Sequence, residues 1–272
     1  MEKSIIEIIK NRKSVRTFDG TPLSQEHKMK IESFIQNPTN PFDVPVTFRV
    51  LNARENGLTS PVITGADTYL AAKVSKIPNF EIAFGYSFEN VCLYAKSLGI
   101  GTVMLAASIN RAVFEQVMQV GENEIMPVAS PLGYPAKKRS IRETVMRKGI
   151  KADERQPFDS LFFDGSFEVG LKSESAGVFA DALEMARWAP SAVNRQPWRA
   201  VIKDNTVHFY EYKNMKESSL MDLQKLDVGI ALCHFDLTMK ENGKDGSFVF
   251  NKPEIEIPEK TEYIVSYILS AE

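Results

Sequence analysis

Three cations and a hydroxyl stand within five residues near the start of the chain, in the run Arg12-Lys13-Ser14-Val15-Arg16. Guanidinium groups bind phosphate oxygens through paired hydrogen bonds, and a serine hydroxyl adds a further short one. The run follows a predicted helix, so the alternative is a charged helix end that interacts favourably with the helix dipole. The composition of the run therefore allows either an anion site or a solvated helix terminus.

A second segment, residues 189–198 with the sequence A-P-S-A-V-N-R-Q-P-W, combines stiffness with hydrogen-bond donors. Two prolines restrict its backbone, and both tryptophans of the chain, Trp188 and Trp198, flank it. Such a loop suits an anionic or heteroaromatic ligand. The alternative is a capped turn whose asparagine and glutamine satisfy the local backbone.

The other side chains that often carry chemistry form no recognisable site in the sequence. The chain contains no G-x-S-x-G, H-E-x-x-H or P-loop motif. Two cysteines cannot form a zinc site on their own, and the three histidines make no pair at a spacing of four. Cys233 and His234 lie inside an apolar helical pattern, which is typical of core residues. We therefore expect neither a metal nor a dyad of catalytic side chains.

Composition narrows the classes of partner. The 33 Lys and Arg against 35 Asp and Glu give a net charge of −2, whereas nucleic-acid binders usually carry a basic excess. The longest uncharged run, 97–110, is too short to cross a bilayer. The N-terminus lacks the pattern of a secretory signal. These features predict a cytoplasmic globular protein that binds neither nucleic acid nor membrane.

Periodicity and turn residues predict a similar order of elements in each half of the 272 residues: helix, Pro/Asn-rich corner, strand, buried helix. The expected helices are 24–36, 85–98, 110–120, 178–188 and 227–239, and the expected strands are 44–51, 69–74, 101–107, 126–132, 199–202 and 207–212. Ser4 and Asn110 are expected to cap helices. The Lys/Arg-rich stretch 137–155 has the composition of a solvated linker. The pattern indicates an internal duplication with domains 1–155 and 156–272.

Several motifs together resemble the FMN-dependent nitroreductase family. They are R-K-S-V-R-x-F at 12–18, L-G-I-G-T at 98–102, P-L-G-Y-P at 131–135 and P-S-A-x-N-x-Q-P-W at 190–198. The resemblance implies an α+β fold with a central, mostly antiparallel β-sheet flanked by helices. Its members are homodimers in which each flavin lies at the interface between subunits.

The chain departs from the family pattern in one respect. Ordinary members carry the basic motif and the corner on one unit, but here residues 37–42 are a degraded corner, and 161–167 lack the cations expected before the second corner. The resemblance thus implies a fused pseudo-dimer of two degenerate halves. We expect one working FMN site per chain, one decayed site, and a monomer with internal pseudo-two-fold symmetry.

Matching positions assigns roles to single residues. The resemblance implies that the FMN phosphate is held by Arg12, Lys13, Ser14 and Arg16, with Lys138 and Arg139 as further cations. It implies that Pro190, Ser191, Ala192 and Asn194 reach the same flavin and that Gln196 supports the corner. Leu105, Ala106 and Ala107 match the stretch whose backbone lies along the flavin ring, where an N–H could bond flavin N5. Removal of Arg12 or Arg16 should then release flavin before it affects the fold.

The implied reaction passes hydride from NADH or NADPH through flavin N5 to an electron-poor small-molecule acceptor. The cofactor carries this chemistry, which agrees with the lack of a catalytic side chain in the sequence. Other reactions of the family remain open: flavin breakdown, reductive dehalogenation and azoline oxidation. A further alternative is a non-catalytic or degenerate flavin-binding protein.

Overall fold

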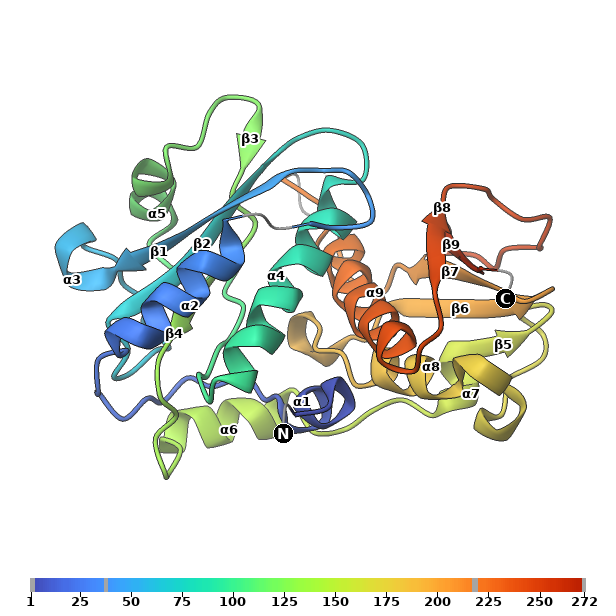
Figure 1. Ribbon diagram of the computed structural model, residues 1–272, viewed down its shortest axis with the longest axis horizontal. Coiled ribbons are helices and arrows are strands. Elements are labelled where there is room, and N and C mark those ends of the chain that lie inside the picture. Colours follow the sequence, from blue (N-terminus) through green and yellow to red (C-terminus); the bar gives the residue numbers. More distant parts are fainter. Residues whose placement is uncertain (1–2, 37–38, 217–219, 271–272) are drawn as a thin grey trace. The chain divides into compact units, whose positions relative to one another are not determined.

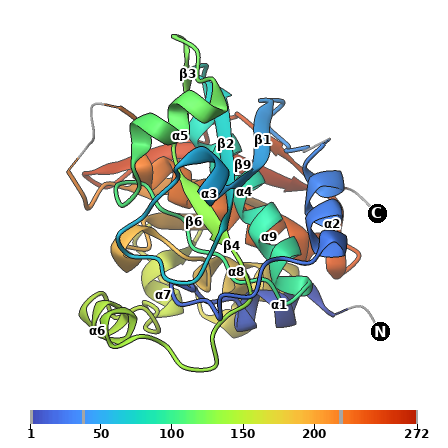
Figure 2. The same cartoon turned by 90° about the vertical axis from the view of Figure 1, so that its left-hand side faces the viewer.

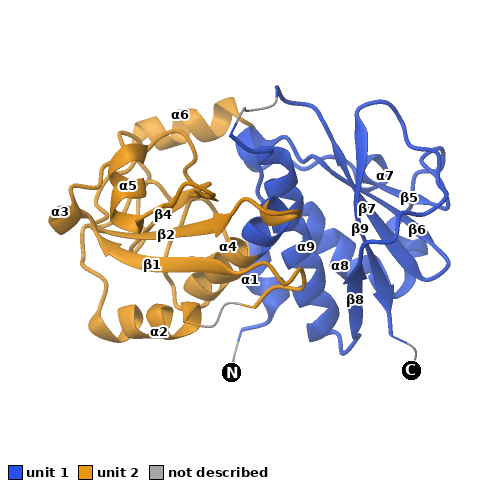
Figure 3. Ribbon diagram, turned by 90° about the horizontal axis from the view of Figure 1, so that it is seen from above, with its two compact units in different colours: residues 1–10, 81–86, 152–272 blue, residues 11–80, 87–151 orange. Residues whose placement is uncertain are grey.

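The computed structural model describes residues 3–36, 39–216 and 220–270 (Figure 1). The chain forms two compact units, shown in different colours in Figure 3. Unit 1 comprises Met1–Lys10, Glu81–Tyr86 and Ala152–Glu272, and unit 2 comprises Asn11–Phe80 and Ser87–Lys151. The chain thus passes from unit 2 to unit 1 close to the domain boundary expected at 155, but unit 1 also takes two earlier segments.

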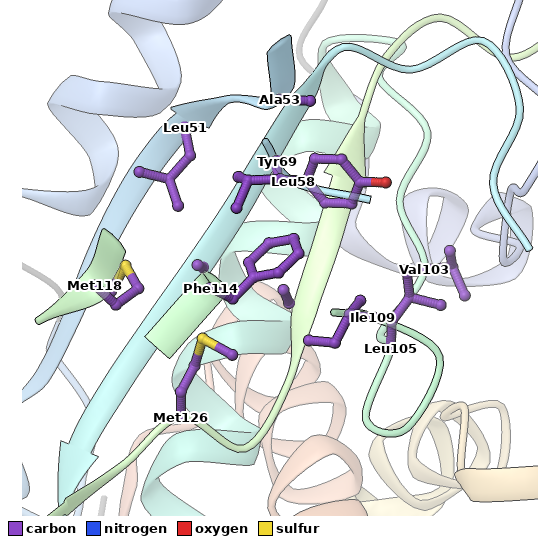
Figure 4. Packing of buried hydrophobic residues seen from close by; sticks show 12 residues of the cluster. Leu51, Ala53, Leu58, Tyr69, Val103, Leu105, Ile109, Phe114, Met118 and Met126 are labelled. Carbon is purple, nitrogen blue, oxygen red and sulfur yellow. The ribbon is translucent and has the colours of Figure 1, made fainter. Parts of the chain in front are cut away.

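The sheet of unit 2 has the strands β1 (Val46–Asn52), β2 (Thr68–Ser75), β3 (Glu124–Ile125) and β4 (Ala129–Leu132). β2 pairs antiparallel with each of the other three. Most side chains of β2 are buried, which explains why this strand reads as a nearly continuous apolar run. Figure 4 shows the core on this sheet, where the rings of Tyr69 and Phe114 meet edge to face at 5.2 Å.

The helices of unit 2 are α2 (Gln25–Ile35), α3 (Ala53–Asn56), α5 (Arg111–Met118), α6 (Ile141–Gly149) and the part of α4 (Phe80–Ser97) that follows Tyr86. Ser24 caps α2 by accepting a hydrogen bond from the N–H of His27 at 3.2 Å. α2 ends one residue before Gln36. Of the corner expected at 37–41, Asn37 and Pro38 lie outside the described residues.

Three local predictions in unit 2 are wrong. The expected strand 101–107 forms only isolated bridges, such as Gly101 to Gly133 and Leu105 to Ala129. The expected linker at 137–155 contains α6, whose N-cap Ser140 accepts from the N–H of Glu143 at 3.1 Å. Asn110 makes no side-chain cap for α5.

The side chain of Asn110 instead fixes a neighbouring loop. Its Oδ1 accepts from the N–H of Thr59 at 2.9 Å, and its Nδ2 donates to the carbonyl oxygen of Gly57 at 2.9 Å. An asparagine side chain can satisfy any nearby backbone, so its position before a helix does not decide its partner.

α6 lies at one end of unit 2, away from β1 and β2 (Figure 2). It is still well packed, because Glu143 and Arg147 on it are buried. The sequence Ser140-x-x-Glu143 is a capping-box pattern, and it is the signal that identifies this helix inside a basic stretch.

The sheet of unit 1 has the order β5-β6-β7-β9-β8. Its strands are β5 (Phe162–Asp164), β6 (Trp198–Lys203), β7 (Thr206–Tyr212), β8 (Gly246–Val249) and β9 (Thr261–Leu269). Only the β5–β6 pair is parallel among these described strands. The fold class expected from the sequence, α+β with mostly antiparallel sheets, is confirmed.

Short polar turns explain the local topology of this sheet. β6 and β7 form a hairpin whose two connecting residues, Asp204 and Asn205, both have positive φ, at 50° and 58°. Asp and Asn tolerate this left-handed conformation, and it matches the twist of the flanking strands.

The helices of unit 1 are α1 (Ile5–Asn11, as far as Lys10), α7 (Phe158–Leu161), α8 (Ala180–Arg187) and α9 (Leu223–Glu241), with three short 3₁₀ turns, Ser173–Ser175, Gly177–Phe179 and Ala192–Asn194. At the start of α1, Ser4 Oγ donates to Glu241 Oε2 at 2.7 Å, and the N–H of Ile6 donates to the same atom at 3.4 Å. A carboxylate from α9 therefore serves the N-terminal N–H groups of α1.

Two glycines let α4 and α9 approach closely within unit 1. A Cβ atom added at Gly85 would overlap the carbonyl oxygen of Leu226, and one at Gly229 would overlap that of Ile82. The helix backbones therefore touch directly at this crossing, which only glycine allows. No helix in the described ranges is long and apolar enough to cross a membrane.

Candidate functional site

The basic run after α1 lines a pocket of about 560 Å³ that lies entirely in unit 2. Three segments meet there: residues 11–17, residues 96–102 at the end of α4, and residues 135–144 leading into α6. The lining residues include six cations, namely Arg12, Lys13, Lys96, Lys137, Lys138 and Arg139. Among these described lining residues there is one carboxylate, Glu143. The pocket is therefore strongly positive.

Backbone pairing holds the three segments of the pocket together. The N–H of Val15 donates to the carbonyl oxygen of Thr102 at 2.9 Å, and that of Gly101 donates to Gly133 at 2.8 Å. A Cβ at Gly101 would lie 3.0 Å from the side chains of Val15 and Pro135, a tighter approach than ordinary contact. The glycine in the run 98–102 thus allows the close packing that brings the cations together.

Arg12 lines the pocket and already has an anionic partner. Its Nε is 3.2 Å from Oε1 of Glu89 on α4, and the two side chains are 8% and 1% exposed. A buried arginine with a buried carboxylate contributes little net charge to its surroundings. We infer that Arg12 supports the pocket through this ion pair, and its predicted role as a counter-charge for phosphate stays a prediction.

Arg16 does not line the pocket but contacts α6 through its backbone. It is absent from the described lining, and its backbone N–H donates to Glu143 Oε2 at 3.3 Å. Burial lowers the pKa of the Arg16 guanidinium, Glu143 raises it, and the nearby Arg147 lowers it. Thr17 Oγ1 donates to the same Glu143 oxygen at 2.8 Å. The second arginine of the motif thus fixes α6, and the structure does not bring it to the other predicted phosphate ligands.

The remaining predicted cations do line the pocket, together with Ser14. Lys13 and Lys138 are exposed, and Arg139 Nε lies 3.7 Å from Glu143 Oε1. Lys96 and Lys137 also line the pocket, and the sequence pattern does not predict them there. Lys137 adjoins the predicted pair, but Lys96 stands in the last turn of α4, where a lysine is ordinary.

Residues 105–107, also in unit 2, are predicted to offer a backbone N–H to flavin N5, but the N–H of Leu105 is already bonded within the protein. The N–H of Leu105 donates to the carbonyl oxygen of Ala129 at 2.8 Å, and Leu105 is buried in the core. Leu105 therefore cannot donate to a flavin. The Ala106 carbonyl oxygen accepts from Arg111 Nη2 at 2.6 Å, and Ala107 is exposed.

The corner at 190–198 lies in unit 1, and its polar side chains mostly serve the protein itself. Ser191 Oγ accepts from the N–H of Gln196 at 2.9 Å. Gln196 is buried, and its Oε1 accepts from the N–H of Gln156 at 2.9 Å. Asn194 Nδ2 donates to the carbonyl oxygen of Glu154 at 3.1 Å. These bonds match the capped-turn alternative, so a ligand of this loop would meet mainly its backbone and apolar surface.

Three residues of the corner adopt left-handed backbone conformations: Val193 at φ 43°, Asn194 at 59° and Gln196 at 52°. A β-branched residue such as valine rarely takes this conformation, and residues held there are often found at ligand sites. Arg155 supports the loop from outside, with Nη2 donating to the Trp188 carbonyl oxygen at 3.1 Å and the guanidinium 5.7 Å above the Trp188 ring.

Unit 1, which contains the corner, also holds two buried acids, Asp227 and Glu211. Asp227 on α9 accepts from the N–H of Ala192 at 2.9 Å. Burial raises the pKa of Asp227, and the bond from Ala192 opposes this rise. Glu211 on β7 is fully buried, and its carboxyl oxygens have no hydrogen-bond partner among the described residues. Burial, with a smaller contribution from Asp222, raises the pKa of Glu211 to about 8.

The basic run belongs to unit 2 and the corner to unit 1. The expectation that both contact one flavin stays a prediction. Within the described ranges, no group of three or more His, Cys, Asp or Glu side chains is placed to hold a metal ion.

Comparison with known proteins gives one family and a set of similar structures. The family model described as "Putative TM nitroreductase" matches residues 4–239. A solved structure from Thermotoga maritima MSB8, described as a nitroreductase, is 22% identical with a TM-score of 0.66, covering 99% of this chain and 95% of that one. An FMN-dependent nitroreductase from Clostridium difficile R20291 is 15% identical with a TM-score of 0.41, covering 53% of this chain and 95% of that one. No curated protein matches.

Proposed function

The chain belongs to this nitroreductase family, and from that premise we propose that it is an oxidoreductase that uses FMN to pass hydride from NADH or NADPH to an electron-poor small molecule. The family match over residues 4–239 supports the oxidoreductase class. The observation that carries the cofactor assignment is the positive pocket of unit 2, because FMN differs from riboflavin by a phosphate and this pocket suits a phosphate.

The residues of the pocket fit a phosphate in both charge and chemistry. A phosphate monoester carries between one and two negative charges at neutral pH and offers three acceptor oxygens. Lys13, Lys138 and Arg139 provide charged donors, and Ser14 provides a hydroxyl. Hydrogen bonds between ionised partners are shorter and stronger than neutral ones. We propose that these four residues hold the phosphate, while Arg12 supports them through its ion pair with Glu89.

When bound, FMN supplies the atom that accepts and releases hydride. The chain contributes position and electrostatics, so no side chain of the pocket has to exchange a proton. In this proposal the backbone of Ala106 and Ala107 lies along the flavin ring, since the N–H of Leu105 is already paired. The contacts of Pro190, Ser191, Ala192 and Asn194 with the same flavin rest on the sequence resemblance.

The proposal keeps the fused arrangement that the sequence predicts. Each chain then binds one FMN, acts as a monomer and carries one decayed site. A ratio of two flavins to one chain in purified protein would contradict this part of the proposal and leave the assignment of FMN itself intact.

Anaerobic addition of NADH or NADPH to the FMN-loaded protein tests the reaction. We expect rapid loss of the flavin absorbance near 450 nm with at least one of the two nucleotides, because a reductase must transfer hydride to its cofactor. Free FMN at the same concentration is the control for uncatalysed reduction. If the loaded protein bleaches no faster than free FMN with either nucleotide, the non-catalytic flavin-binding alternative is correct.

A further inference from the structure

A buried carboxyl group of α9 contacts the strained corner at residues 190–198. Asp227 lies in the second turn of α9, is 3% exposed, and accepts from the N–H of Ala192 through Oδ2 at 2.9 Å. It is not needed to cap its own helix, because Asp222 accepts from the N–H groups of Gln224 and Lys225 there. The carboxyl group of Asp227 is therefore committed to a loop distant in the sequence.

The loop needs such a restraint because its conformation is unfavourable by itself. Val193, at φ 43°, is 53% exposed, so burial of its side chain does not hold it in place. A non-glycine residue kept in the left-handed region persists only when the surroundings determine its conformation. Within the loop, Ser191 and Gln196 bond to each other, whereas Asp227 ties the loop to α9.

We propose that Asp227 is a positioning residue that keeps residues 191–196 in their strained conformation by holding the N–H of Ala192. The role goes beyond the proposed function, since it concerns the shape of the corner with or without a ligand. Its consequence for flavin rests on the proposed contact between the corner and FMN.

The surroundings of Asp227 define which replacement should preserve this role. Asp222, the N-cap residue of α9, and Glu211 on β7 are the acids that act on Asp227, and both raise its pKa, as burial does. Around Glu211 stand Lys213, Lys225 and Glu262. A buried site that disfavours negative charge accepts a neutral side chain of the same shape. Asparagine keeps an oxygen that can accept the N–H of Ala192, whereas leucine does not.

Amide hydrogen exchange in the flavin-free protein tests the proposal. We expect the amide of Ala192 to exchange at least about tenfold faster in Asp227→Leu than in the wild type, while β6 stays protected. In Asp227→Asn, Ala192 should keep the protection of the wild type. Unchanged exchange of Ala192 in the leucine variant, or loss of its protection in the asparagine variant while β6 stays protected, would overturn the proposal.

A second variant keeps the test decisive if Asp227→Leu fails to fold. Val193→Gly removes the cost of the left-handed conformation, since glycine adopts positive φ freely. If Asp227 works by holding a strained loop, Asp227→Leu combined with Val193→Gly should recover a cooperative unfolding transition that Asp227→Leu alone lacks. No recovery in the double variant would mean that Asp227 supports the core in another way.

FMN titration separates this inference from the proposed function. Asp227→Leu should weaken FMN binding at least about tenfold, and Asp227→Asn should leave it close to the wild-type value. If exchange changes as expected but the FMN affinity does not, Asp227 positions the corner and the corner does not contact FMN. If the wild-type protein binds no FMN, the proposed function fails while the exchange result still stands.

Discussion

Replacement of Arg12 by methionine is expected to lower the free energy of unfolding by about 3–5 kcal/mol, measured by urea denaturation. The Arg12 guanidinium lies 3.2 Å from the carboxylate of Glu89, and both side chains are nearly inaccessible to solvent. Removal of the arginine breaks a buried ion pair of Glu89, which costs far more than loss of a surface ion pair. This expected loss of stability is the reverse of the order predicted from the sequence, in which flavin is lost before the fold, and the variant decides between the two.

Two further variants test the cause of this loss. The double replacement Arg12→Met with Glu89→Met removes both charges and should cost much less than Arg12→Met alone, because apolar residues can replace a buried ion pair at little cost. Lys13→Met, at the neighbouring exposed position, should change stability by no more than about 0.5 kcal/mol. If Arg12→Met is as stable as Lys13→Met, the ion pair does not support the pocket.

Replacement of Gly229 by alanine is expected to destabilise the protein by at least roughly 1–3 kcal/mol, seen as a lower thermal midpoint by circular dichroism. The new Cβ would overlap the carbonyl oxygen of Ile82 on α4, and a backbone atom cannot move aside as a flexible side chain can. The helices would have to separate, which opens gaps along the whole crossing.

Gly149→Ala is the matched control for this prediction. Gly149 also lies in a helix, at the end of α6, and a Cβ there meets nothing within 4 Å. Alanine is the better helix former, so this change should leave stability equal or slightly higher. Equal midpoints for Gly229→Ala and the wild type would show that the close crossing is not required.

Local sequence signals predict an element when its own residues carry the apolar pattern or the helix cap. The mostly apolar run at 69–74 predicts β2, and the Ser24 cap with the apolar face that follows it predicts α2 within two residues. The helix expected at 85–98 begins five residues earlier, at Phe80. Asn79 precedes it in a left-handed conformation and makes no side-chain cap bond, so no capping pattern marks this start. That geometry depends on tertiary packing and leaves no signal in the sequence.

The candidate site shows the same division between local and long-range information. The composition of the basic run allowed either an anion site or a solvated helix end, and only the family resemblance implied a phosphate site. The structure brings Lys13, Ser14, Lys138 and Arg139 to one pocket. The sequence does not reveal that Arg12 faces Glu89, because this ion pair joins residues far apart in the chain. For the same reason, only the structure shows that α4 lies against Gly229 of α9.

The most direct test of the central claim compares the affinities of FMN and riboflavin by fluorescence titration. Each charge-assisted hydrogen bond is worth about 1.5–3 kcal/mol, so we expect FMN to bind at least about a hundredfold more tightly. Lys13→Ala with Lys138→Ala should remove most of this difference, whereas Lys148→Ala, on α6 outside the described pocket lining, should preserve it. Equal affinities of the wild-type protein for FMN and riboflavin would contradict the assignment of the pocket.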